Sequence, residues 1–378
     1  MSKLQEKIEN LLAPADIKIN GDRPWDIQIH NEALYRRVLL HGSIGFGEAY
    51  MDGWWDCKEI DEMIRRVFAI DILKHIKPWN AVGTLLLMLT SNRQSKQRAF
   101  QVGEEHYDAG NDLYERMLDK NMTYTCGYWK DTNNLDDAQI AKYELACKKI
   151  GLKTGDTVLD IGCGWGSFAK FATERCGAKV VGLTVSKEQV VLGKKRCAGL
   201  DVVFHLQDYR DFDASTVLGA GKKFDHIVSF GMFEHVGYKN YRVYMEMVHK
   251  NLKDDGLFLL HTIGGNKTVY SGDPWMDKYI FKNGMIPSVA QIGKSVEKLF
   301  VMEDWHNFGA DYDKILMAWH TNFVSHWDEI KDQYNDRFKR MWDFYLLSCA
   351  GSFRSRYIQL WQVVLSKHGV KGGYGRVT

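Results

Sequence analysis

Residues 158–166 are the part of the sequence whose residue types most clearly suggest chemistry. Their sequence is Val-Leu-Asp-Ile-Gly-Cys-Gly-Trp-Gly, followed at 167–172 by Ser-Phe-Ala-Lys-Phe-Ala. The apolar run ending at Asp160 predicts a buried strand, and the residues after the turn predict a helix. The turn glycines, which allow a tight bend and close approach of the backbone to a ligand, are Gly162, Gly164 and Gly166. A glycine-rich turn alone is often only a turn, but these flanks are typical of a nucleotide-binding sheet.

The spacing of the glycines indicates which ligand the turn binds. A dinucleotide-binding turn usually has the spacing Gly-x-Gly-x-x-Gly and holds a pyrophosphate at the start of the helix. Here the third glycine comes one residue earlier, and the large residue Trp165 precedes it. This spacing resembles the first motif of the S-adenosylmethionine (SAM)-dependent methyltransferases, whose cofactor has no pyrophosphate. We therefore expect SAM as the cofactor.

Short apolar segments alternate with helix-length segments along the rest of the chain. We expect strands at residues 179–185, 201–208, 224–230, 257–263, 300–306 and 358–365, helices at 187–197 and 241–252, and a turn at 254–256. Such alternation predicts parallel pairing with both sheet faces covered. The expected fold is α/β: a Rossmann-like, seven-stranded class I methyltransferase sheet with a smaller, mainly helical N-terminal domain. Ligands bind at the carboxyl ends of such strands. We therefore expect one cleft that is lined by residues 160–166, 184–189, 208, 231–234 and 261–263.

The composition is that of an ordinary globular protein. Hydrophobic residues make up 45% of the chain and charged residues 26%, and the net charge of +2 gives no strong preference for polyanions such as nucleic acid. No signal peptide is visible, and the longest apolar stretch, at 81–89, is far shorter than the ~20 residues of a spanning helix. The seven cysteines have no metal-ligand spacing. We therefore expect no metal and a reduced, cytoplasmic compartment.

The N-terminal part differs in character from the rest. We expect a domain over residues 1–90, a linker over 91–100 and a SAM-binding catalytic domain over 101–378. Residues 72–103 contain no Asp or Glu, yet they carry basic residues around the apolar run: Lys74, Lys77, Arg93, Lys96 and Arg98. An apolar run flanked by basic residues can dock on an anionic lipid surface. A buried helix followed by a solvated basic linker explains these residues equally well.

Several motifs outside the glycine turn resemble one family. They are Gly-Glu-Ala-Tyr-Met-Asp-Gly-Trp-Trp at 47–55, His-Tyr-Asp-Ala-Gly-Asn-Asp at 106–112, Tyr-Thr-Cys-Gly-Tyr-Trp at 124–129, Gly-Met-Phe-Glu-His-Val-Gly at 231–237, His-Thr-Ile-Gly at 261–264 and Phe-Gly-Ala-Asp-Tyr at 308–312. From about residue 30 to the C-terminus the chain resembles the bacterial cyclopropane-fatty-acyl-phospholipid synthases. The resemblance implies transfer of a methylene group from SAM to the cis double bond of an acyl chain in a membrane phospholipid.

In that family the base is taken to be a bound bicarbonate. The resemblance implies that it is held by five residues: Cys126, Glu234, His261, Ile263 and Tyr312. Glu234 and His261 also fall at predicted strand ends, where packing needs no polar residue; the alternatives are an ordinary loop carboxylate and a core histidine. Cys349 matches a cysteine once proposed as a nucleophile, but methylenation of an alkene needs no enzyme nucleophile. We expect Cys349 to be structural.

The resemblance also implies the cofactor contacts. These are Tyr124, Thr125, Asp160, Gly162, Gly164, Gly166, Thr184, Ser186, Gln189, Gln207, Asp208 and Tyr209. The second strand of a methyltransferase usually ends in an acidic residue that binds the ribose, whereas Thr184 stands here and Gln189 is available instead. Asp208 would lie near the adenine amino group.

The sequence is also compatible with other activities. The alternatives are a fatty-acyl C-methyltransferase that retains the methyl branch, a small-molecule methyltransferase of the same fold, and a lipid-binding protein with an inactive cofactor site. We expect a homodimer that is cytoplasmic and associates peripherally with the phospholipid bilayer at the inner face of the membrane.

Overall fold

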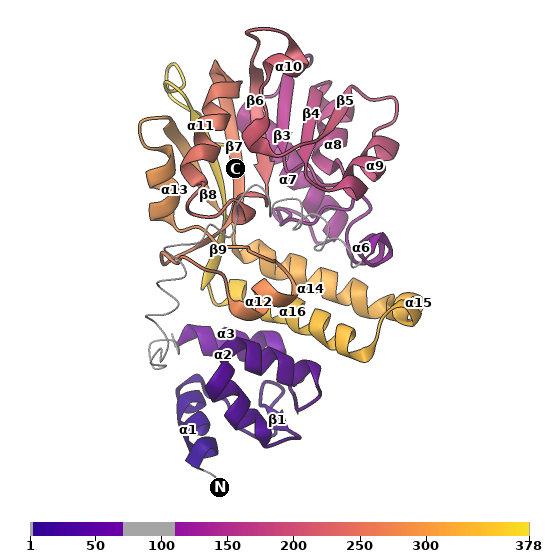
Figure 1. Cartoon of the computed structure of the whole chain (residues 1–378), viewed down its shortest axis with the longest axis vertical. Helices are drawn as coiled ribbons and strands as arrows, with labels where there is room; N and C mark the ends of the chain where they lie inside the picture. The colour runs from indigo at the N-terminus through magenta and orange to yellow at the C-terminus, as the bar shows by residue number, and fades with distance from the viewer. Residues whose placement is uncertain (1–2, 71–109, 378) are drawn as a thin grey trace. The chain divides into compact units, whose positions relative to one another are not determined.

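The computed structural model describes residues 3–70 and 110–377 (Figure 1). Contacts divide these residues into two compact units. A helical unit comprises residues 3–70, 271–282 and 312–358, and a sheet unit comprises residues 110–270, 283–311 and 359–377. The grouping does not follow chain order, because two segments of the predicted catalytic domain pack with the N-terminal residues. The predicted linker at 91–100 and the basic, apolar stretch at 72–103 lie outside the described residues.

The sheet unit is built on seven strands. They are β3 (Thr157–Ile161), β4 (Lys179–Thr184), β5 (Val202–Leu206), β6 (Phe224–Phe230), β7 (Leu252–Gly265), β8 (Val301–Asn307) and β9 (Ile358–Ser366). Their order in the sheet is β5-β4-β3-β6-β7-β9-β8. The first five are parallel, and β8 pairs antiparallel with β9. The chain winds outward in opposite directions from β3 and β6, and this reversal is where ligands of such sheets bind.

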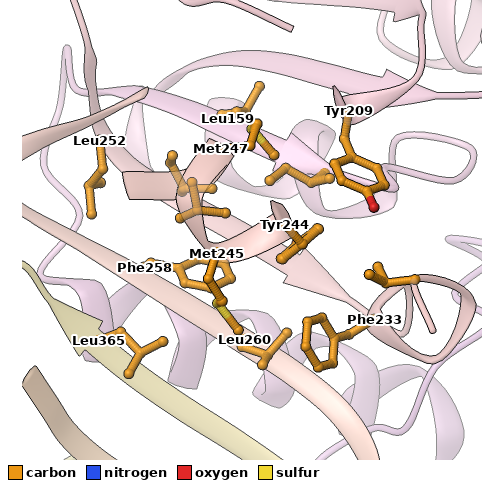
Figure 2. Packing of buried hydrophobic residues seen from close by; sticks show 14 of the residues in the cluster. Leu159, Tyr209, Phe233, Tyr244, Met245, Met247, Leu252, Phe258, Leu260 and Leu365 are labelled. Carbon is orange, nitrogen blue, oxygen red and sulfur yellow. The ribbon is translucent and has the colours of Figure 1, made fainter. Parts of the chain in front are cut away.

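Helices of the sheet unit cover both faces of this sheet. They are α6 (Asn111–Met117), α7 (Leu135–Ile150), α8 (Ser167–Cys176), α9 (Lys187–Arg196), α10 (Ser215–Leu218), α11 (Tyr241–Asn251) and α13 (Val289–Val296), with short 3-10 turns η3 (Tyr209–Asp211) and η4 (Phe233–His235). Successive strand residues point to opposite faces. Leu159 therefore packs in a cluster with residues of α11 and α13, part of which Figure 2 shows, whereas Val158 packs with α7 and α8.

The predicted strands are confirmed within a few residues, with one correction. β7 begins at Leu252, so the turn predicted at 254–256 lies inside the strand. Leu252 pairs with Phe224 of β6, and both side chains are buried. The β6–β7 pairing therefore continues on the N-terminal side of Asp254 and Asp255. The residues that suggested a turn coincide with a shift in the β6–β7 register. Phe224 pairs with Leu252, whereas His226 pairs with Leu257.

The helical unit is built mainly from helices. They are α1 (Lys3–Leu12), η1 (Ala13–Ala15), α2 (Ala33–Met51), α3 (Ile60–Ala69), α12 (Pro274–Tyr279), α14 (Ala310–Ser325), α15 (Trp327–Ile330), η5 (Lys331–Gln333) and α16 (Asp336–Arg354), with the two-stranded pair β1 (Gln28–Ile29) and β2 (Trp55–Asp56). α16 approaches α3 so closely that a Cβ on Gly351 would lie 2.2 Å from the Asp61 carbonyl oxygen. Within the described residues, no helix has both the length and the apolar character that a membrane span requires.

Candidate cofactor and catalytic site

The glycine turn follows β3 directly and leads into α8. Its three glycines have the left-handed φ values of 81° at Gly162, 54° at Gly164 and 81° at Gly166. A Cβ at Gly162 would lie 2.6 Å from the Met232 side chain, whereas nothing lies within 4 Å of a Cβ at Gly164. The backbone N–H groups of Gly162 and Cys163 both donate to the Leu183 carbonyl oxygen, at 2.9 and 3.0 Å. The turn is therefore fixed against β4 and leaves open space at Gly164.

Asp160 is the last polar side chain before this turn. It is 1% exposed, and its Oδ1 atom has no hydrogen-bond partner among the described residues. Burial raises the pKa of Asp160 to about 7, and the positive charge of Lys142 opposes that rise. A buried carboxylate oxygen without a partner is destabilising unless a ligand satisfies it. Asp160 is therefore suited to bind a cationic group, such as the ammonium group of SAM.

The loop after β4 is held by interlocking hydrogen bonds. The Thr184 hydroxyl donates to Gln189 Oε1 at 2.6 Å and accepts from the Ser186 backbone N–H at 3.1 Å. The Ser186 hydroxyl caps α9 by accepting from the Gln189 backbone N–H at 3.4 Å. Thr184 and Ser186 thus orient Gln189, whose side-chain NH2 group remains to donate to a ligand.

The three residues predicted after β5 make local contacts. The Asp208 carboxylate accepts from the Arg210 guanidinium, at 2.8 Å from Nε and 2.7 Å from Nη2. Gln207 donates to the Asp211 carbonyl oxygen at 3.0 Å. The Tyr209 ring packs edge-on against Tyr244 in the core, 5.1 Å between centroids. Their cofactor roles therefore stay predictions.

Glu234 lies in η4, immediately after β6. Its Oε1 atom accepts the Ile263 backbone N–H at 2.6 Å, and its Oε2 atom is buried without a partner among the described residues. Burial raises the pKa of Glu234 to about 7. The bond from Ile263 ties the loop after β6 to β7 and fixes the orientation of the carboxyl group.

His261 lies in β7, beside Phe230 of β6 in the pairing. Its ring is 1% exposed and contacts the rings of Phe230 and Phe308, at centroid distances of 5.5 and 5.8 Å. Burial lowers the pKa of His261 well below its usual value, so the imidazole is neutral. Its Nδ1 atom lies 3.3 Å from Gln362 Nε2, an amide donor. When this amide donates to Nδ1, the Nε2 atom, which has no partner among the described residues, carries the proton and can donate it in a hydrogen bond.

The segment that carries Tyr124, Thr125 and Cys126 packs against the same edge of the sheet. A Cβ on Gly231 would lie 2.7 Å from Thr125 Cγ2, which places Thr125 at the end of β6. The Cys126 thiol donates to the Gly127 carbonyl oxygen at 3.2 Å, and burial raises its pKa well above the usual value. Cys126 is therefore a protonated thiol and not a thiolate nucleophile. The Tyr124 ring packs edge-on against Tyr114 of α6.

Tyr312 and Cys349 belong to the helical unit. The Tyr312 ring stacks on Phe353, 4.3 Å between centroids. Burial raises the pKa of the Cys349 thiol to about 12, so this thiol is protonated at neutral pH. Both residues lie in a different unit from Glu234 and His261, and their roles stay predictions.

Two buried polar residues of α7 were not anticipated. Lys142 and Gln139 are both fully buried, and Lys142 Nζ donates to Thr125 Oγ1 at 2.8 Å and to Gln139 Oε1 at 2.9 Å. The sequence holds one faint signal. Gln139 and Lys142 are three residues apart, and Ala138, Lys142 and Ala146 are four apart, so all share one face of the helix.

The chain is similar to known cyclopropane synthases along most of its length. Residues 94–363 match the family described as mycolic acid cyclopropane synthetase. The cyclopropane-fatty-acyl-phospholipid synthase of Escherichia coli is 53% identical over 365 residues, which cover 96% of this chain and 93% of that protein. A protein named probable fatty acid methyltransferase in Pseudomonas putida is 35% identical over 69% of this chain and 68% of its own length.

Solved structures show the same fold. The cyclopropane synthase MmaA2 of Mycobacterium tuberculosis is 30% identical with a TM-score of 0.65, over 71% of this chain and 98% of that one. A mycolic acid cyclopropane synthase in complex with S-adenosylhomocysteine (SAH) and CTAB is 31% identical, with a TM-score of 0.64 and the same coverage. These likenesses confirm the predicted methyltransferase fold.

Proposed function

Because this chain belongs to the mycolic acid cyclopropane synthetase family of SAM-dependent methyltransferases, we propose that it forms cyclopropane rings in phospholipid acyl chains. In this proposal a methylene group passes from SAM to the cis double bond of an unsaturated chain. One observation carries the proposal beyond family membership. Glu234 Oε2, just after β6, and His261 Nε2, on β7 opposite the last residue of β6, are buried polar atoms without partners among the described residues.

The residues around the turn fit SAM. When bound, SAM supplies an electrophilic methyl group on a sulfonium sulfur. Asp160 would hold the ammonium group of the cofactor with its free Oδ1 atom, and the Gln189 side chain would donate to the ribose. The absence of a side chain at Gly164 leaves room for the cofactor against the backbone.

Glu234 and His261 fit a small, hydrogen-bonding anion such as bicarbonate. When bound, bicarbonate would supply the base that removes a proton from the transferred methyl group. His261 Nε2–H is a donor to an anionic oxygen, and Glu234 Oε2 is an acceptor for a hydroxyl. The Ile263 N–H holds Oε1, so the carboxyl group cannot turn away. Cys126 and Tyr312 complete the proposed set by resemblance.

The surroundings of His261 support chemistry on an alkene. An alkene is a weak nucleophile and must be aligned with the methyl donor in a site without water. Phe230 and Phe308 flank the His261 ring and exclude water from it. Aromatic faces also stabilise the positive charge that develops on carbon when the alkene attacks.

A fatty-acyl C-methyltransferase is the second candidate, because the relative from Pseudomonas putida carries that name. Both activities would add the same carbon, so uptake of label alone does not separate them. The test is incubation with vesicles of unsaturated phospholipid and methyl-labelled SAM, followed by NMR of the acyl chains. We expect cyclopropane proton signals and loss of olefinic signals. A methyl-branched product with a remaining double bond would support the second candidate instead.

A further inference from the structure

Lys142 lies in the core of the sheet unit, beneath the proposed site. Its side chain is fully buried and runs over the rings of Tyr143 and Phe230, with Nζ 4.1 and 5.5 Å from the ring centroids. The hydrogen-bond acceptors of Nζ are neutral: Thr125 Oγ1 and Gln139 Oε1. A buried ammonium group is costly unless nearby charges compensate it.

The other fully buried lysine of α7 shows how such a charge is usually compensated. Lys149 Nζ lies 3.1 Å from Asp304 Oδ2 in a direct ion pair. Within the described part of the chain, Lys142 forms no ion pair with a carboxylate. The carboxylates of Asp119 and Asp160 act on its charge at longer range. Burial lowers the pKa of Lys142 to about 7, and the charges of these two carboxylates oppose that decrease.

Lys142 and Gln139 together fix the segment that leads into the site. Gln139 Nε2 donates to the carbonyl oxygens of Thr123, at 3.3 Å, and Thr125, at 2.8 Å. Lys142 holds the side chain of the same Thr125, whose methyl group touches the end of β6 at Gly231. The position of Thr125 thus depends on two side chains of α7.

We propose that Lys142 is a positioning residue for SAM, because it fixes Thr125 at the site and, in its protonated form, favours the ionised form of the Asp160 carboxylate. The proposal rests on the cofactor site described above and is separate from the identity of the lipid product. A lysine with a purely structural role would affect stability alone.

The charges around these two residues set the expected pH dependence. The groups that act on Lys142 are Asp119, Asp160 and the Cys126 thiol, and Lys142 in turn acts on His261 of β7. Apart from Lys142, three groups interact electrostatically with Asp160, whose charge raises their pKa values. They are Cys163 of the turn, Tyr143 of α7 and Tyr244 of α11. None of these three brings a positive charge, so loss of Lys142 raises the pKa of Asp160 further.

The test is calorimetric titration of the full chain with SAH, which carries the same ammonium group as SAM and needs no lipid. We compare Lys142→Met, which removes the hydrogen bonds and the charge, with Lys142→Gln, which keeps a donor but no charge. Lys142→Met is expected to raise the Kd at neutral pH by about tenfold. In both variants the loss of affinity on acidification should begin about one pH unit higher than in the wild type.

Lys149→Met is the matched control, since it removes a fully buried lysine of the same helix that pairs with Asp304 of β8, and Asp160 is not among the charges that act on it. It should lower the Tm and leave the SAH affinity and its pH profile unchanged. A folded Lys142→Met or Lys142→Gln variant with the wild-type pH profile would overturn the proposal for Lys142 alone. A wild-type chain that does not bind SAH would overturn the proposed function as well.

Discussion

Asp160, Glu234 and His261 share one property at the scale of the single residue. Each has a buried polar atom without a partner among the described residues, and the three lie in or just after the neighbouring strands β3, β6 and β7. Folding alone does not favour such groups, since desolvation without a hydrogen bond is destabilising. We therefore expect that ligands satisfy these three groups.

Replacement of Asp160 tests this idea through stability as well as binding. The pKa of Asp160 is about 7 in the folded chain, against ~3.9 in an unfolded one, so the ionised group destabilises the fold as pH rises above ~4. The destabilisation grows with pH until the pH passes about 7. Asp160→Asn should therefore abolish SAH binding yet raise stability by about 1–3 kcal/mol at pH ~8, with a smaller gain near pH 5.

Thermal unfolding at the two pH values, with calorimetry of SAH, checks this expectation. Asp225→Asn is the control, because Asp225 is a carboxylate outside the predicted site that Thr157 already satisfies through its N–H and hydroxyl groups. That change should lower the Tm. Wild-type SAH affinity in Asp160→Asn would contradict the assignment of Asp160.

Glu234 and Tyr312 are predicted to serve the proton transfer and not the binding of SAM. Glu234→Gln and Tyr312→Phe should lower turnover by roughly 10²–10⁴-fold, as is typical when a base or its positioning partner is lost. SAH affinity should stay within about twofold, because neither residue is part of the glycine turn. Cys349→Ser should be mild, since its thiol is protonated.

Turnover of vesicle substrate is measured with and without dissolved bicarbonate, and SAH affinity is measured on the same preparations. Turnover that depends neither on bicarbonate nor on Glu234 would show that the proposed base is wrong. A Cys349→Ser variant as inactive as Glu234→Gln would contradict the purely structural role expected for Cys349.

At the scale of the element, the proposed site depends on a turn and a helix that lie on either side of β3 in the chain. The turn between β3 and α8 is fixed against β4 by hydrogen bonds to the Leu183 carbonyl oxygen, and α7 holds the segment around Thr125. The turn contributes through its backbone and α7 through the side chains of Gln139 and Lys142, so strain in the turn should affect binding.

Gly164→Val tests the turn. Gly164 has φ of 54° and open space around its Cβ position, so a valine there meets backbone strain but no clash with protein atoms. We expect loss of SAH binding and a stability decrease of about 1–3 kcal/mol. Gly199→Val is the matched control, because Gly199 has φ of 82° and equally open surroundings outside the turn. It should show a similar decrease in Tm with normal SAH affinity; equal affinity in both variants would contradict the role of Gly164.

At the scale of the whole molecule, the helical unit joins segments that are far apart in the sequence. α16 packs on α3 at Gly351. α12 packs on α2 at Gly47, where an added Cβ would lie 2.4 Å from the ring nitrogen of Trp275. Removal of the N-terminal residues would uncover these contacts. Membrane association is therefore better tested by charge changes in the full chain than by truncation.

We predict that the basic stretch at 72–103 docks on anionic lipid. Reversal of Lys74, Lys77 and Lys96 to Glu should weaken co-sedimentation with anionic vesicles and reduce its salt dependence, since each basic residue near such a surface contributes roughly 1 kcal/mol. The control reverses Lys187, Lys194 and Lys195, which are exposed on or beside α9 and give the same change in net charge. Equal binding by both triple variants and the wild type would favour the alternative of a packed helix and linker.

Local pattern predicted the strands and the turn because these features depend on residues that are neighbours in the sequence. The apolar run before Asp160 and the three glycines after it are sufficient to specify a buried strand and a turn with positive φ. The cap of α9 by Ser186 follows from the same local chemistry. Even the misplaced turn at 254–256 coincides with a real irregularity of β7.

Local sequence patterns are therefore sufficient to predict the methyltransferase sheet, its glycine turn and the residues that motifs single out near the strand ends. The hydrogen-bond partners of these residues depend on tertiary packing. A lysine in a helix is normally solvated, and only packing of α7 against Thr125 and the ring of Phe230 makes Lys142 a buried charge. Likewise, only the pairing of β6 with β7 brings the Ile263 N–H to Glu234. Burial and hydrogen bonding between distant segments are properties of the folded chain, which local pattern does not contain.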